Sequence, residues 1–224
     1  MIKGLVFDFD GLIYDTETCD YAALQWLYGK YGQELSIETW GQCIGTNHEF
    51  DPIVHLHELV KPDKTVDELS DARWQYFEEL LSEQGPIPGV VSYLERARAL
   101  DLRIGLASSS PRDWVERYLR RIHLLEFFEI ICTADDVERV KPDPALYKLA
   151  VHGLGINPNE AVAFEDSPNG ALGAKRAGLY CVVIPNGVTR NLSFGDYDLR
   201  LDSMEDMELD ELILTIMRLG GGRK

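Results

Sequence analysis

The chain begins with Ile2-Lys-Gly-Leu-Val-Phe-Asp-Phe-Asp-Gly11, a short and mostly apolar run that leads into two acidic residues. An apolar run of this length is typical of a strand that is buried on both faces of a parallel sheet. Similar runs recur, with room for a crossover helix between them, at residues 103–107, 129–132, 161–164 and 180–184. This βαβ rhythm predicts an α/β fold with a doubly wound, mostly parallel, Rossmann-like sheet.

Three of the segments between these runs begin with a residue type that caps helices, followed by proline. A capping side chain satisfies free backbone N–H groups, and proline is tolerated at the first helical position. The sequence therefore predicts three helix starts, at Ser110-Pro111, Asp143-Pro144 and Ser167-Pro168. Gly178 is predicted to end the third of these helices, because glycine readily adopts the left-handed conformation found at helix C-caps.

Residues 16–85 interrupt the strand rhythm, because their apolar side chains recur at helical spacing. The predicted organisation is a Rossmann-like core of residues 1–15 and 86–218, with a helical cap domain inserted at residues 16–85. The stretch Gly85-Pro-Ile-Pro-Gly89 marks the return to the core. The insertion holds 14 acidic and four basic residues, and it can act as a lid. Residues 219–224 are expected to form a flexible tail.

The composition is that of an ordinary globular protein with a large negative charge. The 224 residues are 45% hydrophobic and 27% charged, which argues against a disordered or fibrous chain. Lysine and arginine number 22 against 38 acidic residues, so the net charge is −16. This charge repels nucleic acids and anionic lipid, and we expect neither as a partner.

The cysteines bear on the cellular compartment. They stand far apart without a C-x-x-C pair, at Cys19, Cys43, Cys132 and Cys181. This spacing favours reduced thiols in the cytoplasm over a disulfide framework or a zinc site. No apolar run approaches the ~18 residues of a membrane span, and the first residues lack the apolar region of a signal peptide. A monomer is the default expectation, although no motif determines the oligomeric state.

Two acidic residues follow the first predicted strand at i, i+2 spacing, which places both carboxylates on one side of an extended backbone. They are Asp8 and Asp10. In an open α/β sheet the carboxyl ends of the strands line the ligand crevice, so both acids face the expected site. Taken alone, the Asp-x-Asp pair is equally well explained by one acid that caps a turn and another in solvent.

Further polar residues follow later strands at the same predicted edge. Ser108 follows the second strand, Glu165 and Asp166 follow another, and Lys141 precedes a predicted helix. Each of them alone is more often a cap or a solvated side chain. Considered together, they form a group of four acids, a hydroxyl and an amine. A divalent cation and a bound phosphate are the simplest way to balance the electric charge of such a group.

Four motifs in a fixed order connect the chain to a known family. They are Phe7-Asp-Phe-Asp-Gly-Leu-Ile-Tyr-Asp15, Leu106-Ala-Ser-Ser109, Lys141-Pro-Asp-Pro144 and Phe164-Glu-Asp-Ser-Pro-Asn-Gly170. Over nearly its whole length the chain resembles the haloacid dehalogenase superfamily, specifically its β-phosphoglucomutase-like branch of phosphatases and mutases with a helical cap. The resemblance implies an Mg²⁺-dependent phosphatase that hydrolyses a small phosphorylated metabolite, such as a phosphosugar.

The resemblance also implies a role for each motif residue. Asp8 is the expected nucleophile, and Asp10 the expected general acid and base. The residues expected to hold phosphate oxygens are Ser108, Ser109 and Lys141. The residues expected to bind Mg²⁺ are Asp8, Asp10 through its main-chain carbonyl, Glu165 and Asp166. Elementary chemistry agrees with these roles. Phosphoryl transfer is accelerated most by cations that neutralise the phosphoryl oxygens and by a covalent step that divides the activation barrier in two.

Two other functions are compatible with parts of this set of residues. A receiver-type signalling domain also uses an acidic cluster, a hydroxyl and a lysine, but such domains are about half this length and lack a helical insertion. A dehalogenase of the same superfamily lacks the second aspartate, whereas Asp10 is present here.

A phosphosugar mutase is the remaining alternative within the branch. Mutases carry a histidine on the first cap helix and a basic loop residue after a glycine. The corresponding segments of this chain read Asp20 and Gly45-Thr-Asn-His48. An acidic insertion that lacks both groups repels a second phosphate, so the sequence favours hydrolysis.

Overall fold

The computed structural model describes residues 1–40 and 50–220. Cys43, His48 and residues 221–224 therefore lie outside the described residues. The chain divides into two compact units, each described here by itself. One comprises Met1–Tyr14 and Gly85–Lys224, and the other comprises Asp15–Gln84.

The first unit contains a parallel sheet. Its order is β3-β2-β1-β4-β5-β6, and all neighbouring strands are parallel. The strands are β1 (Gly4–Phe7), β2 (Arg103–Ala107), β3 (Ile130–Cys132), β4 (Ala161–Glu165), β5 (Tyr180–Val183) and β6 (Leu199–Arg200). This arrangement confirms the predicted Rossmann-like α/β fold. The sixth strand was not predicted, because two residues are too few to show a periodic pattern.

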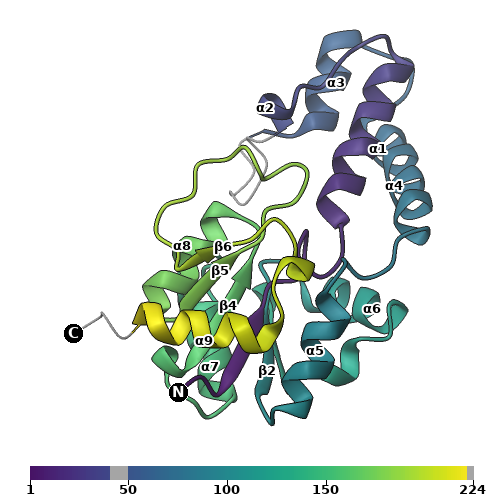
Figure 1. The fold of residues 1–224 in the computed structure, drawn as a ribbon. Coiled ribbons are helices and arrows are strands. Elements are labelled where there is room, and N and C mark those ends of the chain that lie inside the picture. The colour runs from purple at the N-terminus through teal and green to yellow at the C-terminus, as the bar shows by residue number, and fades with distance from the viewer. Residues whose placement is uncertain (41–49, 221–224) are drawn as a thin grey trace. The chain divides into compact units, whose positions relative to one another are not determined.

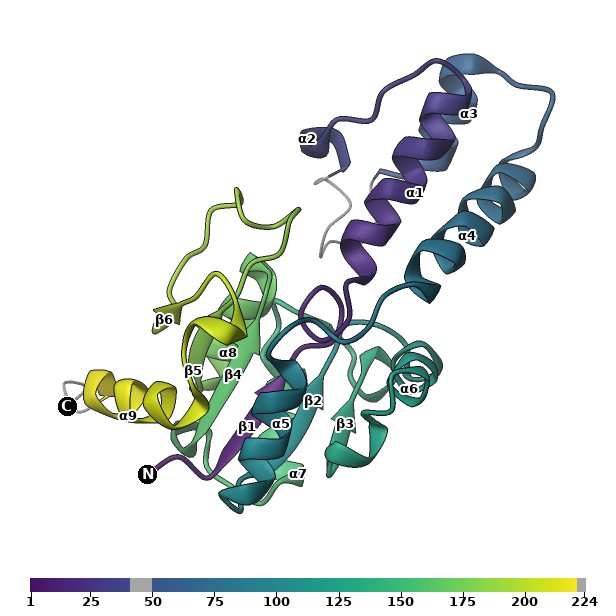
Figure 2. The same ribbon diagram turned by 45° about the vertical axis from the view of Figure 1, so that its right-hand side comes forward.

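Helices cover both faces of the sheet (Figures 1 and 2). On one face lie α5 (Val90–Ala99) and α9 (Leu209–Gly220), and on the other lie α7 (Ala145–Gly153) and α8 (Pro168–Ala177). A further helix, α6 (Arg112–Arg121), joins β2 to β3. Short 3-10 turns lie at Leu125–Phe127, Ala134–Asp136, Pro158–Glu160 and Met204–Asp206. The predicted tail began at residue 219, whereas α9 continues through Gly220.

The alternation of side chains along β1 determines which face each residue meets. Val6 belongs to the apolar cluster that includes residues of α7 and α8. Phe7 points the other way and stacks on Phe164 of β4, with ring centroids 4.8 Å apart, and Phe164 meets Tyr93 of α5. Asp8 comes two residues after Val6, so its side chain continues on the α7 side of the sheet.

One predicted helix start is confirmed and two are shifted. Ser167 caps α8 by accepting a hydrogen bond from the N–H of Gly170, and Gly178 ends that helix at φ +89°. The other two helices begin one residue later than predicted, α6 at Arg112 and α7 at Ala145, with the proline itself in the cap position. Ser110 does not cap α6, because its hydroxyl donates to a carboxylate of the site described below.

In its described residues, 15–40 and 50–84, the second unit consists of helices joined by turns and loops, without strands. Its helices are α1 (Thr16–Lys30), α2 (Ile37–Trp40), α3 (Pro52–Val60) and α4 (Val66–Ser82). Asp15 caps α1, and Thr65 forms a reciprocal capping box with Glu68 at the start of α4. The long helices α1 and α4 lie side by side, and Trp26 of α1 stacks on Tyr76 of α4 with ring centroids 4.4 Å apart.

The thiols in the described residues are free. Cys19, Cys132 and Cys181 are buried, and burial raises the pKa of Cys132 to about 12. A buried thiol with a raised pKa stays protonated at neutral pH and is chemically inert. Among the helices of residues 1–40 and 50–220, none has both the length and the apolar character needed to cross a membrane.

Candidate active site

The strand order places a switch point between β1 and β4, where successive crossovers turn in opposite directions. In open α/β sheets, ligands bind at such a point, outside the carboxyl ends of the strands. Asp8 directly follows β1, and its N–H donates to the carbonyl of Phe164 at 3.0 Å. Glu165 is the last residue of β4 and Asp166 follows it. The fold thus gathers acids from two strands at its ligand-binding edge.

Lys141 joins the two strand ends from the segment ahead of α7. Its Nζ lies 2.5 Å from Oδ1 of Asp8 and 2.6 Å from Oε1 of Glu165. The hydroxyl of Tyr147, on α7, also donates to Oε1 of Glu165, and that of Ser167 lies 3.2 Å from Oε2. Glu165 is fully buried, so these three donors replace the water that its carboxylate loses.

The charges of this cluster influence one another strongly. Burial, and then the carboxylate of Glu165, raise the pKa of Asp8 to about 8, while Lys141 opposes both effects. Burial alone lowers the pKa of Lys141, but the carboxylates of Asp8 and Glu165 outweigh it, so the ammonium group stays charged. Asp166 adds a third carboxylate that is only 1% exposed. With all groups ionised, three carboxylates and one ammonium leave a charge of −2.

The donor set fits a divalent cation. Asp8, Glu165 and Asp166 each offer a carboxylate oxygen, and these oxygens lie within 4.8 Å of one another. Carboxylate oxygens are the ligands that Mg²⁺ prefers, and a single divalent ion balances the charge of −2. The N-terminus of α8 begins two residues beyond Asp166 and favours negative charge there.

The carboxylate of Asp10 lies with a different set of side chains. Its Oδ2 accepts hydrogen bonds from Ser110 at 2.6 Å and Ser108 at 3.4 Å, and its Oδ1 accepts one from Nε1 of Trp114 at 2.8 Å. Ser108 is fully buried, whereas Ser109 is exposed. The acid predicted to carry protons is therefore held by hydroxyl and indole donors, apart from the three-carboxylate group.

A further polar residue reaches the site from the loop after β5. Nδ2 of Asn186 donates to Oδ2 of Asp166 at 2.8 Å and to the carbonyl of Gly11 at 3.3 Å. Gly11 adopts φ +75°, a left-handed conformation that suits glycine in the turn following Asp10. Asn186 thus connects the loops that follow β1, β4 and β5.

Five residues that contact the site are not among the site residues predicted from the sequence: Ser110, Trp114, Tyr147, Ser167 and Asn186. Ser167 was predicted as the cap of α8, and it fills that role as well as contacting Glu165. Asn186 could have been found, because it follows an apolar run at the same edge as the acids. Ser110 lies one residue beyond the serine motif and was assigned to a helix cap instead. Trp114 and Tyr147 lie within helices, where nothing in the sequence distinguishes them from core aromatic residues.

Comparison with known proteins adds independent evidence. The family of haloacid dehalogenase-like hydrolases matches residues 5–184. YhcW of Bacillus subtilis, which bears the name of a phosphatase, is 49% identical over 213 residues, covering 95% of this chain and 97% of that protein. The phosphorylated carbohydrates phosphatase of Thermotoga maritima is 29% identical over 217 residues, covering 95% and 97%.

A solved structure is similar as well. CbbY from Rhodobacter sphaeroides, in complex with xylulose-(1,5)bisphosphate, superimposes with a TM-score of 0.74 at 28% identity, covering 95% of this chain and 99% of that one. The family match extends from β1 through β5, so it includes every strand end that carries an acid of the site. The chain belongs to the haloacid dehalogenase-like hydrolases, and it is an enzyme of their phosphatase type.

Proposed function

We propose that this enzyme hydrolyses small phosphomonoesters, phosphosugars in particular, with Mg²⁺ and through an aspartyl phosphate on Asp8. The observation that carries the proposal is the buried group of Asp8, Lys141, Glu165 and Asp166 at the switch point of the sheet. The substrate class is supported by the relative named for phosphorylated carbohydrates and by the sugar bisphosphate bound to CbbY.

In the first step, a carboxylate oxygen of Asp8 attacks phosphorus and the bond from phosphorus to the ester oxygen breaks. Asp10 gives a proton to the departing alkoxide, so that the product leaves as a neutral alcohol. The ammonium of Lys141, already within 2.5 Å of Asp8, offsets the negative charge of the phosphoryl oxygens as they approach. Ser108 and Ser109 are proposed to hold other phosphate oxygens by hydrogen bonds.

In the second step, water attacks phosphorus and the bond from phosphorus to Asp8 breaks. Asp10 takes the proton of that water, which restores the form it had before the first step. To serve in both steps its carboxylate must exchange some of its bonds to Ser110 and Trp114 for bonds to the reacting oxygens. One residue thus carries the proton of each step.

Mg²⁺ is proposed to bind Asp8, Asp166, Glu165 and the main-chain carbonyl of Asp10. When bound, it supplies a positive charge that neutralises phosphoryl oxygens and the carboxylates around it. Lys141 complements it by keeping Asp8 and Glu165 a fixed distance apart.

The helical unit, Asp15–Gln84, is proposed to act as a cap that selects the substrate. A mutase must hold a second phosphate there, which needs free positive charge. Asp20, at the position of the mutase histidine, is ion-paired with Arg73. Lys30 lies over the ring of Trp26, 3.6 Å from its centroid. Two of the four basic residues of this unit are therefore engaged within it, which supports hydrolysis over isomerisation.

A screen of phosphomonoesters tests the proposal. Purified enzyme should release phosphate from phosphosugars with Mg²⁺ and not with EDTA, and Asp8→Asn should be inactive, which excludes a contaminating phosphatase. Incubation with β-glucose 1-phosphate and a trace of the bisphosphate, followed by NMR, separates the two reactions. Formation of glucose 6-phosphate faster than free phosphate would reject the phosphatase assignment.

A further inference from the structure

Asn186 is oriented by its own loop. Its Oδ1 accepts hydrogen bonds from the N–H groups of Val188 at 2.9 Å and Thr189 at 3.0 Å. Backbone N–H groups can only donate, so the side-chain atom that faces them must be the oxygen. The amide nitrogen consequently faces Asp166 and the carbonyl of Gly11, which are both acceptors. The hydrogen-bond network leaves a single orientation for this amide.

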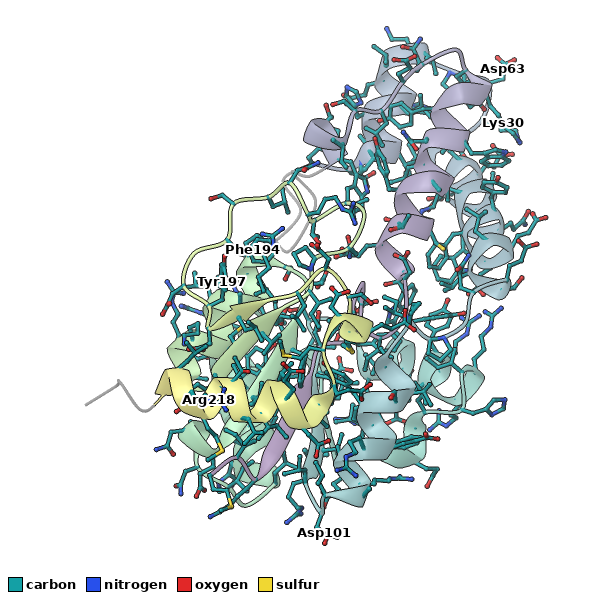
Figure 3. All side chains as sticks on the ribbon, in the orientation of Figure 1. Lys30, Asp63, Asp101, Phe194, Tyr197 and Arg218 are labelled. Atoms are coloured by element: carbon teal, nitrogen blue, oxygen red, sulfur yellow. The ribbon has the colours of Figure 1, made fainter. Side chains whose placement is uncertain are left out.

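The loop that carries Asn186 is itself anchored to the first unit. Thr189 is fully buried, and its hydroxyl lies 3.2 Å from Oδ1 of Asn186. Farther along the same loop, Phe194 packs against the apolar cluster that includes residues of α7 and α8. Its ring also meets that of Tyr197 edge to face, with centroids 6.4 Å apart (Figure 3). Arg200 of β6 lies over the Phe194 ring, 5.3 Å from its centroid. Asn186 is therefore a fixed donor, since both its loop and its own amide are held in place.

The chemistry of an amide suits this place in the site. Asp166 lies within a group of three buried carboxylates, where mutual repulsion pushes each side chain away from the others. A neutral N–H donor fixes one carboxylate oxygen without adding a positive charge that would compete with a cation. Donation to the Gly11 carbonyl, one residue after Asp10, also holds the β1 loop against the β4 loop.

We propose that Asn186 is a positioning residue, which orients Asp166 for Mg²⁺ and holds together the loops that follow β1 and β4. The proposal rests on the proposed function, because it assumes that the acidic group binds the metal. Groups that hold metal ligands by hydrogen bonds typically contribute about 10–100-fold to metal affinity. Loss of the Asn186 amide should weaken Mg²⁺ binding by that factor.

Three variants separate the hydrogen bond from Asn186 to Asp166 from the hydrogen bonds by which Asn186 stabilises its own loop. Asn186→Ser keeps a short acceptor for the N–H groups of residues 188 and 189 but cannot reach Asp166. Asn186→Ala removes both the acceptor for these N–H groups and the donor to Asp166. Thr189→Val is the matched control. It removes the hydroxyl that donates to Oδ1 of Asn186 and accepts from its backbone N–H, and it leaves the bond from Asn186 to Asp166 in place.

The readouts are the Mg²⁺ dissociation constant from titration calorimetry without substrate, and the rise in melting temperature that Mg²⁺ causes. Asn186→Ser and Asn186→Ala should bind Mg²⁺ about 10–100-fold more weakly than wild type, and Thr189→Val should keep an affinity close to that of wild type. In activity assays, the Mg²⁺ concentration for half-maximal rate should rise by the same factor in the two Asn186 variants. At saturating Mg²⁺, the KM for substrate should stay close to that of wild type.

These measurements test the role of Asn186 separately from the proposed function of the enzyme. Wild-type Mg²⁺ affinity in folded Asn186→Ser would overturn the role of Asn186 while leaving the proposed function intact. An equal loss of affinity in Thr189→Val would show that the loop, and not the amide, is responsible, which also overturns it. Absence of Mg²⁺ binding to the wild-type enzyme would overturn both.

Discussion

Gly170 offers a sensitive test of how the acidic group is packed. It lies in the first turn of α8, and a Cβ at this position would overlap the carboxylate of Glu165. That carboxylate cannot withdraw freely, because Lys141, Tyr147 and Ser167 all donate to it. Gly170→Ala should therefore force the carboxylate to move and to lose at least one of these bonds.

The cost can be estimated from general magnitudes. Loss of one hydrogen bond to a buried charge costs about 1.5–3 kcal/mol, and overpacking of a buried site costs about 1–3 kcal/mol. The higher helix propensity of alanine relative to glycine offsets roughly 0.5–1 kcal/mol of this destabilisation. The free energy of unfolding should fall by about 2–5 kcal/mol, which for a chain of this size lowers Tm by roughly 4–20 °C.

Gly173, one turn farther along α8, is the matched control. A Cβ there would lie 3.5 Å from the carbonyl oxygen of Asp143 and 3.7 Å from the ring of Tyr147, which are ordinary contacts. Gly173→Ala should thus be neutral or stabilising by up to ~1 kcal/mol. Thermal and urea unfolding, followed by circular dichroism in EDTA, compare the two variants. Equal stability of Gly170→Ala and Gly173→Ala would refute the packing argument.

Further predictions concern the catalytic residues and the metal. Asp8→Asn should abolish phosphate release and leave the circular dichroism spectrum unchanged; residual steady turnover would contradict a covalent intermediate. Asp10→Asn should lower kcat by about 10²–10⁴-fold, and rapid-quench assays should show both transfer and release slowed. Tyr147→Phe should lower the free energy of unfolding by about 1.5–3 kcal/mol, since Glu165 loses a buried donor; wild-type stability would count against that bond. Mg²⁺ at 100 times its Kd should stabilise the EDTA-treated protein by about 2.7 kcal/mol, and an unchanged Tm would argue against a metal site.

Local patterns in the sequence were sufficient to predict five of the six strands of the sheet and the edge on which its acids lie. The runs at residues 103–107 and 161–164 match β2 and β4 to within one residue, because strands buried on both faces are read directly from continuous apolar stretches. The parallel arrangement then placed Asp8 and Asp166 at one edge of the sheet before any contact was known. Ser167 and Gly178 marked the ends of α8, since caps depend only on neighbouring residues.

Contacts between distant segments were decided only by the tertiary structure. Lys141 is 133 positions from Asp8, and Asn186 is 175 positions from Gly11, yet each pair is hydrogen-bonded. No local pattern encodes such a pair, because its distance depends on strand order and on the path of every intervening loop. Ser110 shows the same limit, since a hydroxyl beside a helix start can cap that helix or bind Asp10, and only the packed sheet determines which acceptor lies within reach.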